Sequence, residues 1–379
     1  MLKLVKRLLC VACLAGLLVL GAWSVYNGLA SGVTRSQVDT AEELEDTLTN
    51  RLPYRELLLD PFRIANVALG RTYYRSHNIY IREDGMYLQG SSLHEVTVAA
   101  DGLEGLDAFC QEHDIQFLHV ILPSKPQYDE DVWARGIPCN RNRTADCLCA
   151  ELDARGVPRL DLREAFRCDD YYARWFYATD HHWTPEAALV AARLISQRLN
   201  DEYGYQIDLS RLADDQFVRE TSSLLWVGEL GSKALGSRGT LDEFTAVLPA
   251  YPVSLRLVDE PAGVDETGGF EVLLDEGRLE QPGPVANTSL YYYYWPGSSG
   301  IVDIYDNDVQ GGNVLLVHDS FSNAMAPFLA LGVEHLTLWD MRYTDDSLYE
   351  YLEAHPEIDT VIVAYSLSFV PTSYMNTFY

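Results

Sequence analysis

The sequence predicts an α/β fold whose central, mainly parallel β-sheet is flanked by helices. Short, continuous apolar runs of strand type alternate with amphipathic helical patterns along the chain. Such runs indicate strands that are buried on both faces, because the crossover helices of a parallel sheet cover both of its sides. We expect the four clearest runs, residues 116–122, 313–317, 335–339 and 360–365, to lie in one sheet.

The N-terminus predicts the compartment. A basic head over residues 3–7 precedes an uncharged run over 8–23, which is typical of a secretory signal or a signal anchor. Extended through Tyr26, the run approaches the roughly 20 residues that span a bilayer, and the basic head predicts that the rest of the chain lies outside the cytoplasm. We expect residues 1–32 to form a retained anchor, with a cleaved signal as the alternative, and 33–379 to form the folded domain.

Helical and strand patterns alternate through the first half of the chain. Residues 41–69 have helical spacing with breaks at Pro53 and Pro61. Thr184 and Pro185 predict the start of a helix, because Thr is a favoured N-cap and Pro is favoured at the first helical position. The same patterns predict helices over 103–112, 147–155 and 185–199, a short strand over 158–162, and two strands over 78–88 around an Asp84-Gly85 turn.

The second half begins with a different composition. Residues 203–307 are poorer in helical patterns and richer in Gly, Pro and aromatic residues, which predicts an inserted β-rich lobe or a set of long loops. Within this stretch, the YYYYW run at 291–295 predicts a strand with alternate tyrosines in the core. Exposed aromatic rings that stack on sugars are the alternative. Helical patterns then return over 321–331 and 345–354.

The charge balance limits the partners. The chain of 379 residues has 28 basic and 56 acidic side chains and a formal net charge of −28. Nucleic-acid binding needs a basic surface, so a nucleic-acid partner is excluded, as is electrostatic attraction to anionic lipid head groups. Hydrophobic residues at 47% and charged residues at 22% are typical of a globular protein, which excludes a wholly disordered chain.

The cysteines predict a disulfide. Disulfides form readily outside the cytoplasm, and a short polar stretch separates Cys139 from Cys147 and Cys149. We therefore expect a bridge from Cys139 to one of the other two. A zinc site is the alternative, although Cys-x-Cys without a paired Cys-x-x-Cys is poor zinc spacing. With Cys110 and Cys168, the number of cysteines outside the N-terminal run is odd, so one thiol would stay unpaired.

The first candidate site is the TDHHWT run at 179–184, directly before the predicted helix. Asp180 and His182 are two residues apart, so the carboxylate can hold the imidazole in one tautomer and stabilise the imidazolium that forms during proton transfer. Two alternatives are a helix-capping loop with surface histidines and a metal site built on Asp180, His181 and His182.

The second candidate site is Ser320, which follows the strand run 313–317 and opens a helical pattern. Ligand sites form at the carboxyl ends of parallel strands, and the free N–H groups at a helix start can stabilise an oxyanion. The alternative is that Asp319 or Ser320 only caps the helix. A serine at one such switch and Asp-x-His at another together predict a Ser–His–Asp triad.

With these runs in place, the sequence resembles the bacterial family named for its Asp-His-His-Trp motif, here Asp180 to Trp183. More distantly it resembles the periplasmic alginate O-acetyltransferases with an SGNH-hydrolase-like domain. The matching pieces extend over most of the chain and include NRLPYR at 50–55, NIYI at 78–81, LPSKP at 122–126, YDN at 305–307, DSF at 319–321 and WDMRY at 339–343.

The resemblance implies a circularly permuted SGNH-hydrolase-like arrangement in which the Asp-x-His pair precedes the serine. Carried over from the acetyltransferases, the triad is Asp180, His182 and Ser320, and His181 is a bystander. One departure concerns the oxyanion pocket, because His318 stands where the family has a glycine two residues before the nucleophile.

Three further residues are candidates for substrate or oxyanion contacts. Asn323 and Arg342 are candidates for either, and Lys125 is a candidate for holding the anionic part of a ligand. A Lys125 with a buried stem and a solvated ammonium group is the alternative. We expect no metal and no cofactor.

The implied activity is serine-dependent O-acylation outside the cytoplasm, most simply O-acetylation of a cell-surface polysaccharide. The expected partners are the polysaccharide acceptor, the membrane through the N-terminal anchor, and a membrane-bound O-acyltransferase that supplies the acyl group. A carbohydrate esterase with the same triad and a non-catalytic glycan-binding or assembly factor are the alternatives.

Overall fold

The computed structural model describes residues 71–126, 137–234, 240–295, 297, 299–372 and 377–378, together with 15, 19, 65 and 68–70. The chain has two compact units, Met1–Arg71 and Thr72–Tyr379, and the second contains all the elements below. The anchor expected over 1–32 and the helical pattern over 41–69 lie almost wholly outside the described residues. Among the helices that are described, none has the length and apolar character that a membrane span needs.

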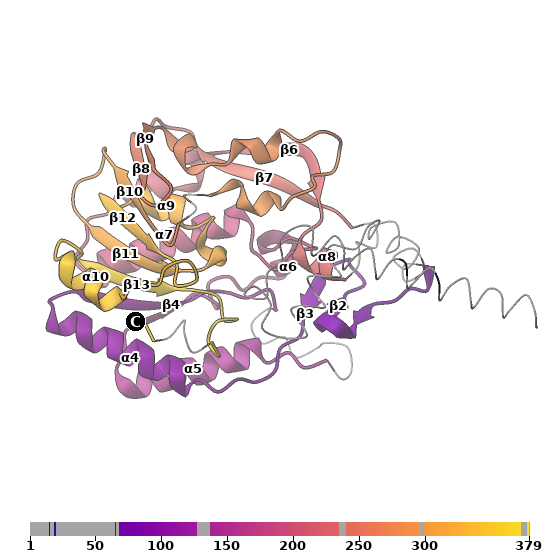
Figure 1. Cartoon of the computed structure of the whole chain (residues 1–379), viewed down its shortest axis with the longest axis horizontal. Coiled ribbons are helices and arrows are strands. Elements are labelled where there is room, and N and C mark those ends of the chain that lie inside the picture. The colour runs from indigo at the N-terminus through magenta and orange to yellow at the C-terminus, as the bar shows by residue number, and fades with distance from the viewer. Residues whose placement is uncertain are drawn as a thin grey trace, which may run out of the picture. The chain divides into compact units, whose positions relative to one another are not determined.

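An eight-stranded mixed sheet forms the centre of the larger unit, with the order β5-β4-β13-β11-β12-β10-β8-β9 (Figure 1). Neighbours from β5 to β12 are parallel, whereas β10, β8 and β9 each pair in antiparallel fashion at the far edge. The strands are β4 (Gln116–Ile121), β5 (Arg159–Asp161), β8 (Leu255–Asp259), β9 (Val264–Gly268), β10 (Ile301–Asp306), β11 (Asn313–His318), β12 (His335–Trp339) and β13 (Thr360–Ala364). All four predicted strand runs lie in this sheet, which confirms the predicted fold class.

Helices cover both faces of the sheet because its central strands are apolar on both sides. Along β11, Val314 and Leu316 pack into one core, and Leu315 and Val317 pack into the other. The second core contains side chains of α4 (Thr97–Glu112), α5 (Arg141–Arg155) and α10 (Leu348–Ala354). In Figure 1, α4 and α5 lie together below the sheet. The first core contains side chains of α7 (Pro185–Glu202) and α9 (Ala326–Ala330).

The structure divides the stretch 203–307 between two sheets. β6 (Phe217–Trp226) and β7 (Asp242–Pro249) form a separate antiparallel pair, whereas β8, β9 and β10 extend the central sheet. On β10, which pairs with β12 on one side and β8 on the other, buried and half-buried side chains alternate, as expected for an antiparallel strand with one face on the core. The connections contain single-turn 3-10 helices: η3 (Leu209–Leu212), η4 (Asp214–Gln216), η5 (Phe270–Leu273), η6 (Glu276–Leu279) and η7 (Leu290–Tyr293).

The tyrosine run departs from its prediction. It forms the 3-10 turn η7 rather than a strand, and this turn buries both Tyr291 and Tyr293. The expected helix over 321–331 is also divided, into the 3-10 turn η8 (Ser320–Ser322) and α9. Both differences have the same cause. Contacts with residues far away in the sequence determine the conformation of each segment, and such contacts leave no periodic pattern in the sequence.

A second, three-stranded antiparallel sheet precedes the main one. It contains the two strands expected around the Asp84-Gly85 turn. Gly85 has φ of +87°, a left-handed conformation that favours glycine in such a turn. The elements are β1 (Tyr73–Tyr74), η2 (Arg75–His77), β2 (Ile79–Ile81) and β3 (Tyr87–Gln89), and the remaining short helices of the unit are α6 (Tyr171–Trp175) and α8 (Glu229–Lys233).

The predicted disulfide is wrong. Cys147 and Cys149 are both free thiols, so neither forms a bridge with Cys139. The physical reason is that the segment from Arg141 onward is already helical, so Cys147 is exposed while Cys149 faces the core. The Cys149 thiol lies 3.6 Å from the Asp161 carboxylate, and burial raises its pKa to about 11, which keeps it protonated.

Candidate active site

The loop over 179–184 is held in shape at both ends. Thr184 is the N-cap of α7, and its hydroxyl accepts a hydrogen bond from the Ala187 N–H, with Pro185 at the first helical position as predicted. Its own N–H donates to the carbonyl of Trp175 over 2.8 Å. Because these contacts close the loop, the side chains of residues 180–182 project from a rigid turn at the start of a long helix.

Asp180 is buried, and both of its carboxylate oxygens have partners. Oδ1 accepts from the backbone N–H of His182 over 2.9 Å, and Oδ2 accepts from the Glu229 N–H over 2.7 Å. The second contact depends on Gly228, because a Cβ at that position would lie 2.4 Å from Asp180 Cβ. Neither Gly228 nor Glu229 was among the predicted site residues, since a glycine before a short helix is a weak signal without its distant partner.

Two buried side chains, those of Asp242 and Lys125, also bind the backbone of this loop. The Asp242 carboxylate accepts hydrogen bonds from the Ala178 N–H and from both the N–H and the hydroxyl of Thr179. Lys125 Nζ donates to the carbonyl of Ala178 over 2.8 Å and to that of Asp180 over 2.6 Å. These contacts determine where the Asp180 backbone lies.

Lys125 is only 4% exposed. It lines a small cavity with His181 and Phe321 rather than the cavity at Ser320. Burial lowers the pKa of Lys125 to about 7, although Asp242 and Asp180 act in the opposite direction. The amine donates to backbone carbonyls, and the solvated ammonium group considered as the alternative is not found either.

Ser320 lies directly after β11, at the carboxyl end of the parallel strands. Asp319 caps the turn: its carboxylate accepts from the Phe321 N–H over 2.9 Å and from the Ser366 N–H over 3.0 Å. This carboxylate therefore joins the Ser320 turn to the segment that follows β13. The cap considered as an alternative function for this run is present, and it belongs to Asp319, which leaves the Ser320 hydroxyl available for other contacts.

The two candidate sites meet. His182 Nε2 lies 3.2 Å from Ser320 Oγ, and His182 Nδ1 lies 2.6 Å from Asp180 Oδ1. Both distances are within hydrogen-bond reach, as the sequence analysis predicted. Trp183 joins the two segments, because its indole Nε1 donates to the Phe321 carbonyl over 2.8 Å. The Asp-His-His-Trp run thus supplies both the polar pair and the contact that places it against the serine.

Two aromatic rings pack against His182. Tyr291 stacks on it with ring centroids 3.8 Å apart and planes at 10°, and its hydroxyl lies 2.8 Å from the Ser320 carbonyl. His181 also packs on the His182 ring at 3.8 Å, while its own Nδ1 lies 3.2 Å from a Glu229 carboxylate oxygen. Tyr291 was not among the predicted site residues, and its position in an aromatic run is the only sequence signal for it.

The protonation states suit a base and a nucleophile. Burial acts to raise the pKa of Asp180, but the adjacent His182 and His181 hold it well below its ordinary value, so the carboxylate is charged. Burial lowers the pKa of His182, and His181 adds to this effect, while Asp180 acts against it. A charged carboxylate can only accept, so Nδ1 carries the proton and Nε2 is free to accept one from Ser320.

A cavity of about 250 Å³ opens beside Ser320. Asn323 and Arg342 line it, as does His318, which stands in place of the expected glycine. The Asn323 side-chain amide has no hydrogen-bond partner within the described part of the chain, so it is available to a ligand. Arg342 is paired with Asp340, with Nε 2.8 Å from Oδ1. The full described lining is Arg278, Tyr292, Trp295, Gly297, Ser299, Val302, His318, Ser320, Asn323, Leu338, Asp340, Arg342 and Tyr343.

The metal alternative has a geometric basis but a chemical difficulty. Asp180, His181 and His182 bring one ligand atom each within 4.8 Å of one another. However, both ring nitrogens of His182 already have partners, Asp180 on Nδ1 and Ser320 on Nε2. A metal ion at this point would have to displace one of them, so the arrangement favours proton transfer.

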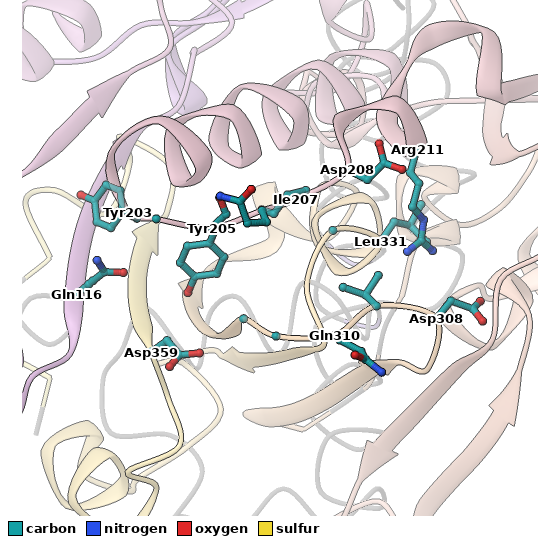
Figure 2. A pocket seen from close by; sticks show the side chains of 16 residues that line it. Gln116, Tyr203, Tyr205, Ile207, Asp208, Arg211, Asp308, Gln310, Leu331 and Asp359 are labelled. Atoms are coloured by element: carbon teal, nitrogen blue, oxygen red, sulfur yellow. The ribbon is translucent and has the colours of Figure 1, made fainter.

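Another cavity, of about 540 Å³, lies at the opposite end of the parallel strands, where they begin (Figure 2). Gln116, Tyr205 and Asp359 are among its lining residues, and the described lining contains no serine, cysteine or histidine. Several of its polar groups serve the fold: the Tyr205 hydroxyl donates to Thr360 Oγ1, and Asp359 accepts from the Asn313 N–H. It therefore lacks the groups for acyl transfer.

Comparison with known proteins agrees with this architecture. Residues 82–234 match the family model of the SGNH hydrolase-like domain of the acetyltransferase AlgX. The chain has the SGNH hydrolase-like fold. The match to AlgX contains Asp180 and His182 but ends before Ser320, so the candidate role of Ser320 rests on its contact with His182.

Solved structures extend the likeness over most of the chain. PatB1 of Bacillus cereus is 19% identical with a TM-score of 0.62, covering 78% of this chain and 98% of its own. PatB1 with a sulfonyl adduct is 18% identical with a TM-score of 0.63 and covers 78% and 97%. A DHHW family protein from Eubacterium siraeum is 18% identical with a TM-score of 0.60 and covers 79% and 93%. The resemblance drawn from the sequence is confirmed, whereas a search of the curated proteins finds no match.

Proposed function

We propose that this chain is an extracytoplasmic, serine-dependent O-acyltransferase that acetylates a cell-surface polysaccharide. The observation that carries the proposal is the continuous contact from Asp180 through His182 to Ser320, with 2.6 Å between the first two side chains and 3.2 Å between the last two. A nucleophile, a base and a group that orients the base are the parts that acyl transfer through a covalent intermediate requires. The match to an acetyltransferase domain supports the same chemistry.

In the first half-reaction, His182 Nε2 takes the proton of Ser320 Oγ while the oxygen attacks the carbonyl carbon of the acyl donor. The resulting tetrahedral oxyanion faces the cavity, where the Asn323 amide is available to donate a hydrogen bond. The intermediate then expels the leaving group, which takes the proton from His182. The product of this half-reaction is an ester between the acyl group and Ser320.

In the second half-reaction, a sugar hydroxyl enters the same cavity and gives its proton to His182 as it attacks the ester carbonyl. Collapse of the second tetrahedral intermediate breaks the bond to Ser320 Oγ, which recovers its proton from His182. The acyl group leaves on the sugar. Asp180 stays charged throughout and stabilises the imidazolium that forms in each half-reaction.

The proposed donor and location rest on the N-terminus of the sequence. The basic head and the uncharged run over 8–23 support an anchor that holds the domain outside the cytoplasm. An acyl group produced in the cytoplasm must then cross the membrane, so a membrane-bound O-acyltransferase is the natural donor. This part of the proposal rests on the sequence, since the anchor lies outside the described residues.

Hydrolysis by the same triad is the second candidate. Ser320 is half-buried and lines an open cavity, so water can reach the ester as well as a sugar can. The two activities differ only in which nucleophile resolves the acyl-enzyme.

The test uses the full chain in detergent with p-nitrophenyl acetate as donor, with and without neutral oligosaccharides. Intact mass should show an acetyl group on the peptide that contains Ser320, and a sulfonyl fluoride should label the same residue. Ser320→Ala should abolish both adducts and His182→Ala should nearly abolish them, because members of a triad act as a unit. The matched controls Ser223→Ala and His113→Ala change exposed residues and should behave like the unaltered chain. Adducts that persist in Ser320→Ala would overturn the proposal.

The reaction product then distinguishes a transferase from an esterase. Transfer predicts acetylated oligosaccharide in the mass spectrum and faster release of p-nitrophenol when acceptor is added. Hydrolysis predicts acetate alone, at a rate that acceptor does not change.

A further inference from the structure

The cavity at Ser320 adjoins a second, larger one. The second cavity has a volume of about 420 Å³ and shares two lining residues with the first, Ser299 and Tyr343. The other described residues around it are Pro261, Gly300, Ile301, Thr344, Asp345 and Asp346. Since both cavities contain these two residues, they lie side by side along the surface, one at the nucleophile and the other beyond Tyr343, and we refer to the pair as the depression.

Tyr343 stands between the two cavities with its side chain 63% exposed. Such exposure is unusual for a large ring in this fold, because the other described tyrosines at the site, Tyr291 and Tyr292, are buried or half-buried. The Arg342 guanidinium lies over one face of the Tyr343 ring, 5.2 Å from its centroid. The other face is apolar, and a flat apolar face matches the C–H face of a pyranose ring.

The ring projects from a rigid backbone. A Cβ at Gly300 would lie 2.6 Å from the carbonyl carbon of Tyr343, so the two chain segments touch. The Tyr343 N–H donates to the Asp340 carbonyl over 3.0 Å, and the Asp340 N–H donates to the Gly300 carbonyl over 2.8 Å. Because the backbone that carries Tyr343 is already ordered, packing of a ligand on the ring costs little additional conformational entropy of the protein.

The charges of the depression select against acidic ligands. The two arginines of the first cavity are each ion-paired, Arg342 with Asp340 and Arg278 with Asp275. In the second cavity the charged side chains of the described lining are acidic, Asp345 and Asp346. A uronic-acid polymer would therefore meet negative charge without an unpaired cation in the described lining to bind it, whereas a neutral sugar would find hydroxyl and carboxylate acceptors.

We propose that this depression is an extended acceptor subsite for a glycan chain of neutral sugars, in which one sugar ring stacks on Tyr343 while a neighbouring sugar presents its hydroxyl to Ser320. The inference rests on the proposed acyl transfer and adds the class and the length of the acceptor. The nucleophile occupies the first cavity, so a ring held on Tyr343 belongs to another residue of the same chain. An acceptor that spans both cavities then binds more tightly than a single sugar.

The test compares glucose with cellotetraose, chitotetraose and mannotetraose, and these with tetragalacturonate, using the full chain and p-nitrophenyl acetate. The best neutral tetrasaccharide should have a lower KM than glucose, and tetragalacturonate should be the poorest acceptor. Tyr343→Ala should raise the KM of the tetrasaccharide by about tenfold, equivalent to about 1.4 kcal/mol, and should raise that of glucose much less. Tyr343→Phe keeps the ring and should keep most of the preference. Val98→Ala, an exposed change on α4, is the matched control.

Each outcome has one interpretation. Failure to form the acetyl ester on Ser320 would refute the proposed function itself. An ester that forms normally, together with an equal KM change for glucose and tetrasaccharide in Tyr343→Ala, no change at all, or a preference for tetragalacturonate, would overturn the subsite and leave the function standing. Because the Tyr343 side chain is mostly exposed, its replacement should leave the fold intact, and a thermal melt checks this.

Discussion

Tyr291 contacts both His182 and Ser320. Its ring lies parallel to the ring of His182 with centroids 3.8 Å apart, and its hydroxyl lies 2.8 Å from the Ser320 carbonyl. One buried side chain thereby sets the position of the base relative to that of the nucleophile. Tyr291 acts through its packing on His182 and its contact with the Ser320 backbone, so we regard it as a positioning residue.

We therefore expect the ring and the hydroxyl of Tyr291 to make separable contributions. An aromatic pair contributes about 0.5–1.5 kcal/mol beyond the area it buries, and about 1.4 kcal/mol corresponds to tenfold in rate. Tyr291→Leu should slow Ser320 acetylation by about tenfold, whereas Tyr291→Phe, which keeps the stack, should retain most of the rate. The stacked ring also favours the imidazolium, so its loss should shift the acidic limb of the pH profile to lower pH. An unshifted profile in Tyr291→Leu would indicate a purely structural role.

The rate of acetylation should depend on the protonation of His182. Only the neutral imidazole can accept the proton of Ser320, so the rate should fall as pH falls through the pKa of His182. Because burial lowers that pKa below its ordinary value of 6.5, the midpoint should lie below 6.5. The measurement is the burst of p-nitrophenol against pH, with the far-ultraviolet circular dichroism recorded at each pH to exclude acid unfolding. A midpoint above 6.5 would mean that Asp180 outweighs burial.

Gly228 should tolerate no side chain. A Cβ would lie 2.4 Å from Asp180 Cβ, so Gly228→Ala must move the Asp180 loop and disturb the hydrogen bond from the Glu229 N–H. We expect a loss of about 1–3 kcal/mol in stability, which is typical of overpacking, and a marked loss of acetylation. Gly105→Ala is the matched control, because a Cβ there meets only the Tyr349 hydroxyl at 3.7 Å inside helix α4. The control should keep its activity and unfold at the same or a higher temperature.

Replacement of Lys125 distinguishes a positioning role from ligand binding. Lys125→Met would leave the buried Asp180 carbonyl without its donor, whereas the Ala178 carbonyl keeps the hydrogen bond from the Tyr87 N–H. An unsatisfied buried carbonyl costs about 1–3 kcal/mol, so urea unfolding should show a loss of stability together with slower acetylation. If Lys125 instead bound an anionic ligand, the variant would keep its stability and lose only affinity for that ligand.

His181→Ala separates the proton-transfer mechanism from a metal site. In the described structure His181 contacts the His182 ring, Glu229 and Asp180, and it makes no hydrogen bond to Ser320. We expect the variant to retain most of its acetylation rate, and a chelator such as EDTA should leave the unaltered chain active. Loss of activity in both experiments would favour the metal site formed by residues 180–182.

Much of this architecture follows from local patterns. The four apolar strand runs of the central sheet, the start of α7 at Thr184 and the turn at Gly85 were predictable, because hydrophobic periodicity, caps and turn residues act over a few neighbouring positions. The contact of His182 with Ser320 was also predictable, since strand ends and helix starts converge on one edge of such a sheet.

The rest depended on tertiary structure. The contacts of Lys125 with the Asp180 loop, of Gly228 with Asp180 and of Tyr291 with His182 each join segments that are far apart in the chain, and none of them leaves a periodic trace. The disulfide prediction failed for a related reason, because a polar stretch with no strong apolar face became helix α5 through its packing. The sequence alone determined the strands and predicted the residues of the candidate triad, while their surroundings were decided by which distant surfaces could pack together at van der Waals contact.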